Sequence, residues 1–198
     1  CKQFVNHAGR ELYRCPSLCR WLALAALALS GPAAAGSLHP WRQPGAPELL
    51  SLEQRISPPP GFTRQPVPET SFAGWLRGLP VKPEGAAVTL FDGQAKARQD
   101  VHAAVLDIDT GRRDLQQCAD AVMRLRAEWL YAQRRYGDIG FNFTSGKRVA
   151  FARYAKGERP DSSGATWRGR AKPDRSYGAF RRYMDLIFAY AGTASLAK

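Results

Sequence analysis

A nine-residue apolar run at residues 21–29 determines how much of this chain is left to form a folded domain. A basic stretch precedes the run, and Ala33 and Ala35 follow it in the small-x-small pattern that signal peptidase recognises. The run is too short to cross a bilayer, which takes about 20 apolar residues. We therefore expect a cleaved signal peptide at residues 1–35 and a periplasmic or secreted mature protein. A short buried helix or an uncleaved anchor are the alternatives.

The chain is strongly basic and its mature region keeps one cysteine. The formal net charge is +12, from 29 Lys+Arg and 17 Asp+Glu. This charge favours anionic cell-envelope partners such as phospholipid head groups, lipopolysaccharide or glycans, and the alternative is a solvated basic surface without a partner. We expect no nucleic-acid partner for an exported protein, and we expect the leader to engage the secretion machinery. Because Cys118 is the only cysteine after the cleavage point, an intrachain disulfide is excluded in the mature form.

Proline and glycine divide the mature region into an arm and a domain. Residues 36–69 are proline-rich and predict a linker that becomes an ordered arm, so we assign the domain to residues 70–198. The apolar periods indicate an α+β domain, with a long helix packed on one face of an antiparallel sheet and a second helix beside it. The predicted strands are 87–91, 103–108, 139–144 and 148–154, the helices 72–79, 114–136 and 176–191, and the long loop 157–174. We expect the domain to continue past Lys198.

The long helix carries the main chemical signal. Asp114 is its predicted N-cap, Gln117 completes a capping box, and Gly137 is the predicted C-cap. Residues spaced by three and four predict its apolar face, and these are Leu115, Cys118, Val122, Leu125 and Trp129.

Cys118 is the first catalytic candidate, because the dipole at a helix N-terminus favours a thiolate. Gln117, just before it, can donate to an oxyanion, as can Gln116. His102 is the only histidine after the linker and the candidate base. The alternative is a core cysteine packed with apolar neighbours on the same helix face.

Two other groups of residues are candidates for binding. The first group is three aspartates whose oxygens could bind a cation, and these are Asp107, Asp109 and Asp114. One of them lies in the tripeptide Asp109-Thr110-Gly111, which resembles the turn of aspartic proteases. Turn formation and helix capping are the alternative explanation for all three aspartates. Arginines alternate with aromatic residues between 153 and 175, a pattern suited to a glycan phosphate or a membrane surface, or simply to a solvated loop. We expect no cofactor and no metal.

The stretch 104–128 contains the run Asp114-Leu-Gln-Gln-Cys-Ala-Asp120 and is similar to an exported bacterial family, domain of unknown function 4846. The similarity extends over about residues 58–198, through 72–80 and 191–196. It implies an exported or envelope-associated protein. Family members continue into a half with a Gly-His-Ala-type strand, similar to the histidine strand of NlpC-type papain-like hydrolases. The resemblance thus implies an incomplete papain-like domain, with Cys118 at the nucleophile position and the base outside this sequence.

Two functions follow from these observations. The first is a papain-like cysteine hydrolase, an amidase or peptidase that cleaves an amide bond in the cell envelope. Cys118 attacks, Gln117 or a backbone N–H holds the oxyanion, and a histidine takes the proton. The second is a non-enzymatic binding or scaffolding module of the periplasm that uses its basic surface.

Overall fold

The computed structural model describes residues 38–169 and 171–197. The chain divides into two units, Cys1–Ala35 and Gly36–Lys198, and the features below belong to the second unit. The predicted signal peptide lies outside the described residues. Within the described part of the chain, no helix has the length and apolarity needed to cross a bilayer.

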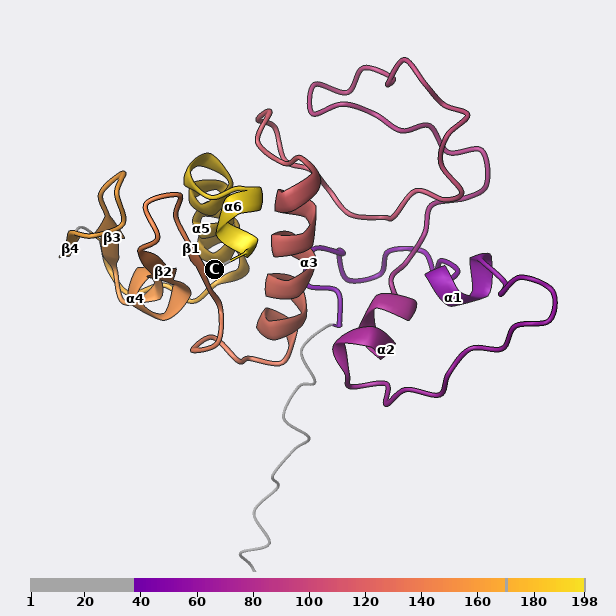
Figure 1. Ribbon diagram of the computed structural model, residues 1–198, viewed down its shortest axis with the longest axis horizontal. Helices are drawn as coiled ribbons and strands as arrows, with labels where there is room; N and C mark the ends of the chain where they lie inside the picture. The colour runs from indigo at the N-terminus through magenta and orange to yellow at the C-terminus, as the bar shows by residue number, and fades with distance from the viewer. Residues whose placement is uncertain (1–37, 170, 198) are drawn as a thin grey trace, which may run out of the picture. The chain divides into compact units, whose positions relative to one another are not determined.

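The described residues form an α+β fold, as predicted. The strands make two separate two-stranded antiparallel sheets where the sequence predicts a single sheet. Figure 1 shows these short hairpins on one side of α5 and the long helix α3 on the other. The elements in order are α1 (Leu52–Arg55), α2 (Phe72–Arg77), α3 (Cys118–Ala132), β1 (Gly140–Asn142), β2 (Arg148–Ala150), α4 (Phe151–Ala155), β3 (Glu158–Pro160), β4 (Trp167–Gly169), α5 (Tyr177–Tyr190) and α6 (Thr193–Leu196).

The C-terminal helix α5 is the element that the sequence describes best. Ser176 caps it, because its hydroxyl accepts the backbone N–H of Ala179 at 3.2 Å. Its predicted apolar stripe is buried and packs against α4 and β2, and the buried members are Phe180, Tyr183, Met184, Ile187 and Phe188. Ser71 caps α2 in the same way, through the N–H of Gly74.

The long helix begins and ends inside its predicted bounds. Asp114 is not its N-cap, because α3 begins at Cys118 and Gln117 occupies the cap position. The Asp120 carboxylate accepts the backbone N–H of Gln117 at 3.0 Å, which fixes the start of the helix there. Gly137 is not the C-cap either, since Gln133 follows the last helical residue.

The predicted apolar face of α3 is also wrong in part. Trp129 is buried, but Val122 is 57% exposed and Cys118 is exposed. The buried face of α3 consists of Asp120, Met123, Arg124, Ala127, Glu128, Trp129 and Leu130. An arginine and a glutamate occupy core positions because they neutralise each other's charge, as described below.

The strands are shorter than predicted. The hairpin at 139–154 is present as β1 and β2, which pair Phe141 with Val149, but the second strand stops at Ala150 and α4 follows at once. The predicted strands at 87–91 and 103–108 form only isolated bridges, Thr89 with Ala95 and Val81 with Leu106. The predicted loop 157–174 contains the β3–β4 hairpin.

Three tryptophan side chains join distant segments of the chain, and two of them, Trp41 and Trp75, attach the arm to the rest of the domain. Each indole N–H donates to a backbone carbonyl far away in the sequence. Trp41 bonds to Asp107 at 2.6 Å, Trp75 to Leu38 at 3.0 Å and Trp129 to Thr70 at 3.2 Å. These bonds let the indoles pack into apolar surroundings without an unpaired donor.

Candidate anion-binding site

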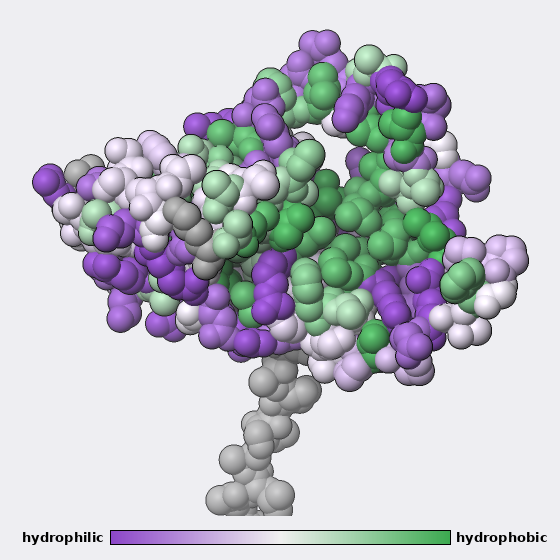
Figure 2. All heavy atoms as spheres, viewed as in Figure 1, coloured by the Kyte–Doolittle hydropathy of each residue, from purple (hydrophilic) through white to green (hydrophobic). Residues whose placement is uncertain are grey.

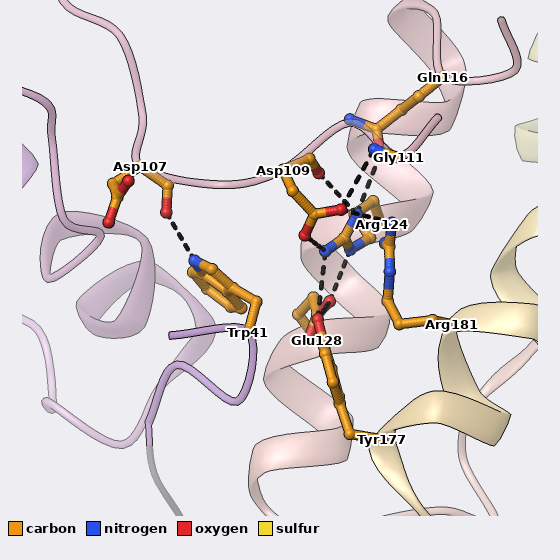
Figure 3. Close-up of polar contacts among 9 residues, drawn as sticks. All are labelled: Trp41, Asp107, Asp109, Gly111, Gln116, Arg124, Glu128, Tyr177 and Arg181. Carbon is orange, nitrogen blue, oxygen red and sulfur yellow. Dashed lines mark hydrogen bonds and ion pairs between the residues drawn. The ribbon is translucent and has the colours of Figure 1, made fainter. Parts of the chain in front are cut away.

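A charged pair lies in the interior, on one face of α3. Arg124 and Glu128 are both 0% exposed, and the Nε of Arg124 donates to Oε1 of Glu128 at 2.6 Å. Their spacing of four residues places the side chains one above the other on the helix (Figure 3). Burial of two charges is costly unless they are paired and hydrogen-bonded, so the surrounding contacts decide whether this pair is stable.

Tyr177 of α5 completes the pair. Its hydroxyl donates to Oε1 of Glu128 at 2.7 Å and accepts from NH2 of Arg124 at 3.2 Å. Burial raises the pKa of Glu128, and Arg124 opposes that effect. Burial also lowers the pKa of Arg124, but Glu128 and Tyr177 outweigh burial and the pKa is raised, so the guanidinium stays charged. Oε2 of Glu128 is buried and has no hydrogen-bond partner among the described residues.

The Asp109-Thr110-Gly111 turn packs directly against this pair. Oδ1 of Asp109 accepts the N–H of Gly111 at 3.1 Å, and Gly111 has φ +80°, a left-handed conformation that favours glycine. The same carboxylate pairs with Arg124 at 3.4 Å and with Arg181 of α5 at 3.0 Å. The carboxylate of Asp109 is thus used to form the turn and to pair with two arginines. This agrees with the structural interpretation of Asp109-Thr110-Gly111 that stood beside the resemblance to aspartic proteases.

The other aspartates do not gather around a cation. Asp107 pairs with Arg42 at 3.1 Å, and Asp114 is exposed. In the described ranges, no three His, Cys, Asp or Glu side chains are grouped closely enough to hold a metal ion. Asp107 and Asp109, which the sequence offered as ligands for a cation, instead form ion pairs with arginines.

Next to this network lies a cleft of about 430 Å³ lined by three arginines. Arg113 comes from the segment before α3, Arg159 from β3 and Arg182 from α5. One carboxylate, Asp185, shares the cleft, and burial raises its pKa while Arg113 lowers it. The remaining lining is Tyr154, Pro160, Leu186, Ala189 and Tyr190. The cleft therefore combines three positive charges with an aromatic and aliphatic wall.

The three arginines are held to different degrees. Arg159 lies over the ring of Tyr154, 3.6 Å from its centroid, and its NH1 donates to the carbonyl of Tyr154 at 2.8 Å. Arg182 pairs with Asp174 at 3.0 Å at the surface. The guanidinium of Arg113 makes no hydrogen bond and no ion pair within the described part of the chain, although the backbone carbonyl of Arg113 accepts the N–H of Leu115. Its guanidinium is therefore available to a ligand.

The basic aromatic segment predicted from the sequence contributes part of this cleft. Tyr154 and Arg159 line it, while Arg153 lies over Trp167, 4.4 Å from the ring centroid, outside the cleft. The segment is thus folded around α4 and β3–β4, and hydrophilic side chains predominate on that side of the face shown in Figure 2.

The three predicted catalytic residues do not share one cavity. Cys118 is the first residue of α3 and Gln117 its N-cap, and both are exposed, so Cys118 is not packed in the core. His102 lines a different cavity of about 450 Å³, together with Arg55 and Lys82. Neither Cys118 nor Gln117 lines that cavity. The structure places two of the three side by side and the histidine elsewhere.

Comparison with known protein families gives one match, to the model described as domain of unknown function (4846), over residues 52–198. No curated protein and no solved structure matches the chain. The matched range includes every residue of the arginine-lined cleft and of the buried network.

Proposed function

The chain belongs to the family described as domain of unknown function (4846), and we propose that its domain binds an anionic component of the cell envelope in the arginine-lined cleft. The observation that carries this proposal is the convergence of Arg113, Arg159 and Arg182, from three separate segments, on one cavity. Guanidinium groups bind phosphate and carboxylate oxygens through paired, charge-assisted hydrogen bonds.

The lining also indicates the size and character of the ligand. A volume of about 430 Å³ exceeds that of a single phosphate group and leaves room for part of the molecule that carries it. Tyr190 and Leu186 offer this part an apolar wall. A phosphorylated or carboxylated glycan or lipid head group fits that description.

The predicted leader supports an envelope location. The apolar run at 21–29 and the Ala33/Ala35 pattern are those of a signal peptide. Expressed with its leader in a Gram-negative host, the protein should accumulate in the periplasm with Gly36 as its first residue, as N-terminal sequencing would reveal. Uncleaved protein in the cytoplasm would contradict the envelope location and leave the cleft proposal intact.

Calorimetric titration with inorganic pyrophosphate tests the cleft. Arg113→Ala and Arg182→Ala should each weaken binding by at least about tenfold, because each removes a charge-assisted hydrogen bond worth about 1.5–3 kcal/mol. Arg98→Ala is the matched control, since Arg98 is exposed and pairs with Asp100 outside the cleft. Equal affinities for the wild type and both cleft variants would refute the proposed site.

Cysteine hydrolysis is the second candidate, favoured by the exposure of Cys118 in the first turn of α3. In this reaction a base from elsewhere in the protein takes the thiol proton, the Cys118 sulfur attacks the carbonyl of an envelope amide, and Gln117 donates to the oxyanion. The C–N bond then breaks, the base returns the proton to the leaving amine, and water hydrolyses the thioester to free Cys118. Iodoacetamide labelling at about pH 6 measures the thiolate directly. Labelling no faster than that of a free cysteine peptide would remove this candidate.

A further inference from the structure

The buried Arg124 bonds to both ends of the segment that carries Arg113. At one end, its NH1 donates to the backbone carbonyl of Asp109 at 3.2 Å, and its NH2 pairs with the carboxylate of the same residue. At the other end, NH1 donates to Oε1 of Gln116 at 3.2 Å. Arg113 lies between these two ends and lines the cleft (Figure 3 shows the bonds to Asp109 and Gln116).

The guanidinium of Arg124 has little freedom to move. Glu128 and Tyr177 hold the guanidinium of Arg124 from two different helices. Arg181 of α5 holds the second oxygen of Asp109. The next residue of that helix, Arg182, is one of the cleft arginines, so α5 connects the network to the cleft.

We propose that Asp109 and Gln116 are positioning residues for anion binding: through Arg124 they fix the segment 109–116 and thereby hold Arg113 where an anion in the cleft meets it. This inference rests on the proposed function. Neither residue touches the ligand, and both act through the place they give to Arg113. A charged side chain that is held in position before the ligand arrives loses less entropy on binding and binds more tightly.

A purely structural role is the alternative. In that case, removing the contacts that Asp109 and Gln116 make with Arg124 lowers the free energy of unfolding and leaves the affinity of the folded protein for the anion unchanged. The two roles differ in their dependence on Arg113, because only a positioning residue loses its effect when the side chain it positions is absent.

A double-mutant cycle separates the two roles. The variants are Asp109→Asn, Gln116→Ala and Arg113→Ala, with each of the first two also combined with the third, and pyrophosphate affinity is measured on protein that circular dichroism shows to be folded. Asp109→Asn and Gln116→Ala should each weaken binding about fivefold. In the Arg113→Ala background, both should change the affinity by less than about twofold.

Asp107→Asn is the matched control for charge. It removes the same negative charge two residues away, from a carboxylate that pairs with Arg42 and not with Arg124. It should therefore not weaken pyrophosphate binding. Gln116→Ala leaves the net charge unchanged, so it carries the test alone if Asp109→Asn does not fold.

The outcomes are distinguishable. If Arg113→Ala does not weaken binding, the cleft proposal itself fails. In two other outcomes the cleft stands and the positioning role is overturned. In the first, Arg113→Ala weakens binding while Asp109→Asn and Gln116→Ala do not. In the second, Asp109→Asn and Gln116→Ala weaken binding equally with and without Arg113.

Discussion

The hydroxyl of Tyr183 on α5 donates to the backbone carbonyl of Val149 in β2 at 2.9 Å, and both residues are fully buried. Burial raises the pKa of this phenol, so the hydroxyl keeps its proton and remains a donor. Tyr183→Phe removes this buried hydrogen bond, while Val149 stays paired with Phe141 in the hairpin, and should cost about 0.5–1.5 kcal/mol in the free energy of unfolding, measured in urea. Tyr190→Phe, which changes a partly exposed tyrosine on the same helix, should cost less than about 0.5 kcal/mol. Equal losses for both variants would contradict the role of this bond.

The buried ion pair predicts a non-additive pair of substitutions. Arg124→Met leaves the Glu128 carboxylate buried without its cation and should cost about 3–5 kcal/mol of unfolding free energy. Adding Glu128→Leu removes that unpaired charge and should recover at least about 2 kcal/mol, because apolar side chains of similar size replace buried pairs well. Urea unfolding of the single and double variants checks this, and a double variant less stable than Arg124→Met would show that the pair does not act as a unit.

Asp185 should make anion binding depend on pH. Its pKa is raised, mainly by burial and against the influence of Arg113, so it takes up a proton at higher pH than an ordinary aspartate. Below that pKa the cleft loses its one negative charge, and sulfate, which does not titrate in this range, should bind about fivefold more tightly than above it. The gain appears as the pH falls from neutrality through the pKa of Asp185 and disappears as the pH rises again.

Asp185→Asn is the control for this pH dependence. The amide stays neutral, so the variant should bind sulfate tightly at neutral pH and show a flat profile. A variant that keeps the slope of the wild type would assign the titration to another group.

The turn before α3 depends on its glycine. Gly111 has φ +80°, so Gly111→Ala should cost about 1–2 kcal/mol in the free energy of unfolding and should also weaken pyrophosphate binding, because the turn holds the segment of Arg113. Gly137→Ala is the control, since a methyl group there meets nothing within 4 Å and should change stability by less than about 0.5 kcal/mol. Thermal unfolding and calorimetry measure the two effects, and a fully stable Gly111→Ala would mean that the turn tolerates another backbone conformation.

The elements best predicted from the sequence are those whose burial follows a local apolar period. In α5, Phe180, Tyr183, Ile187 and their neighbours recur at three and four residues, and Ser176 marks the start, so both the helix and its buried face could be predicted. The β1–β2 hairpin was predicted correctly for the same reason, since alternation around the Ser145-Gly146 turn indicates paired strands.

The long helix α3 was mispredicted because its buried face includes charges. Arg124 and Glu128 look like an exposed salt bridge in the sequence, and the residues that allow their burial, Asp109 and Tyr177, come from distant segments. One local signal did exist: Met123, Ala127 and Leu130 form an apolar row at spacings of four and three, and the charged pair is adjacent to it. That row could have placed the pair at the edge of the core.

The cleft could not be predicted as a unit. Arg159 stood out within the basic aromatic segment, but Arg113 and Arg182 come from segments 46 and 23 residues away along the chain. Only the packing of β3 and α5 beside the segment before α3 brings the three together. The candidate catalytic cysteine was singled out from local sequence alone, and its exposure could not be deduced from a helix face that was itself misassigned.

The indole bond of Trp41 has a practical implication for trimming this protein. It attaches the arm to the carbonyl of Asp107, only two residues ahead of Asp109. A shortened protein that starts at residue 70 would lose this hydrogen bond. The carbonyl of Asp107 would then lack its donor, close to the segment 109–116 that carries Arg113. Truncations intended for crystallography or binding assays should therefore start no later than residue 38, or weak binding by the fragment will be mistaken for a property of the intact domain.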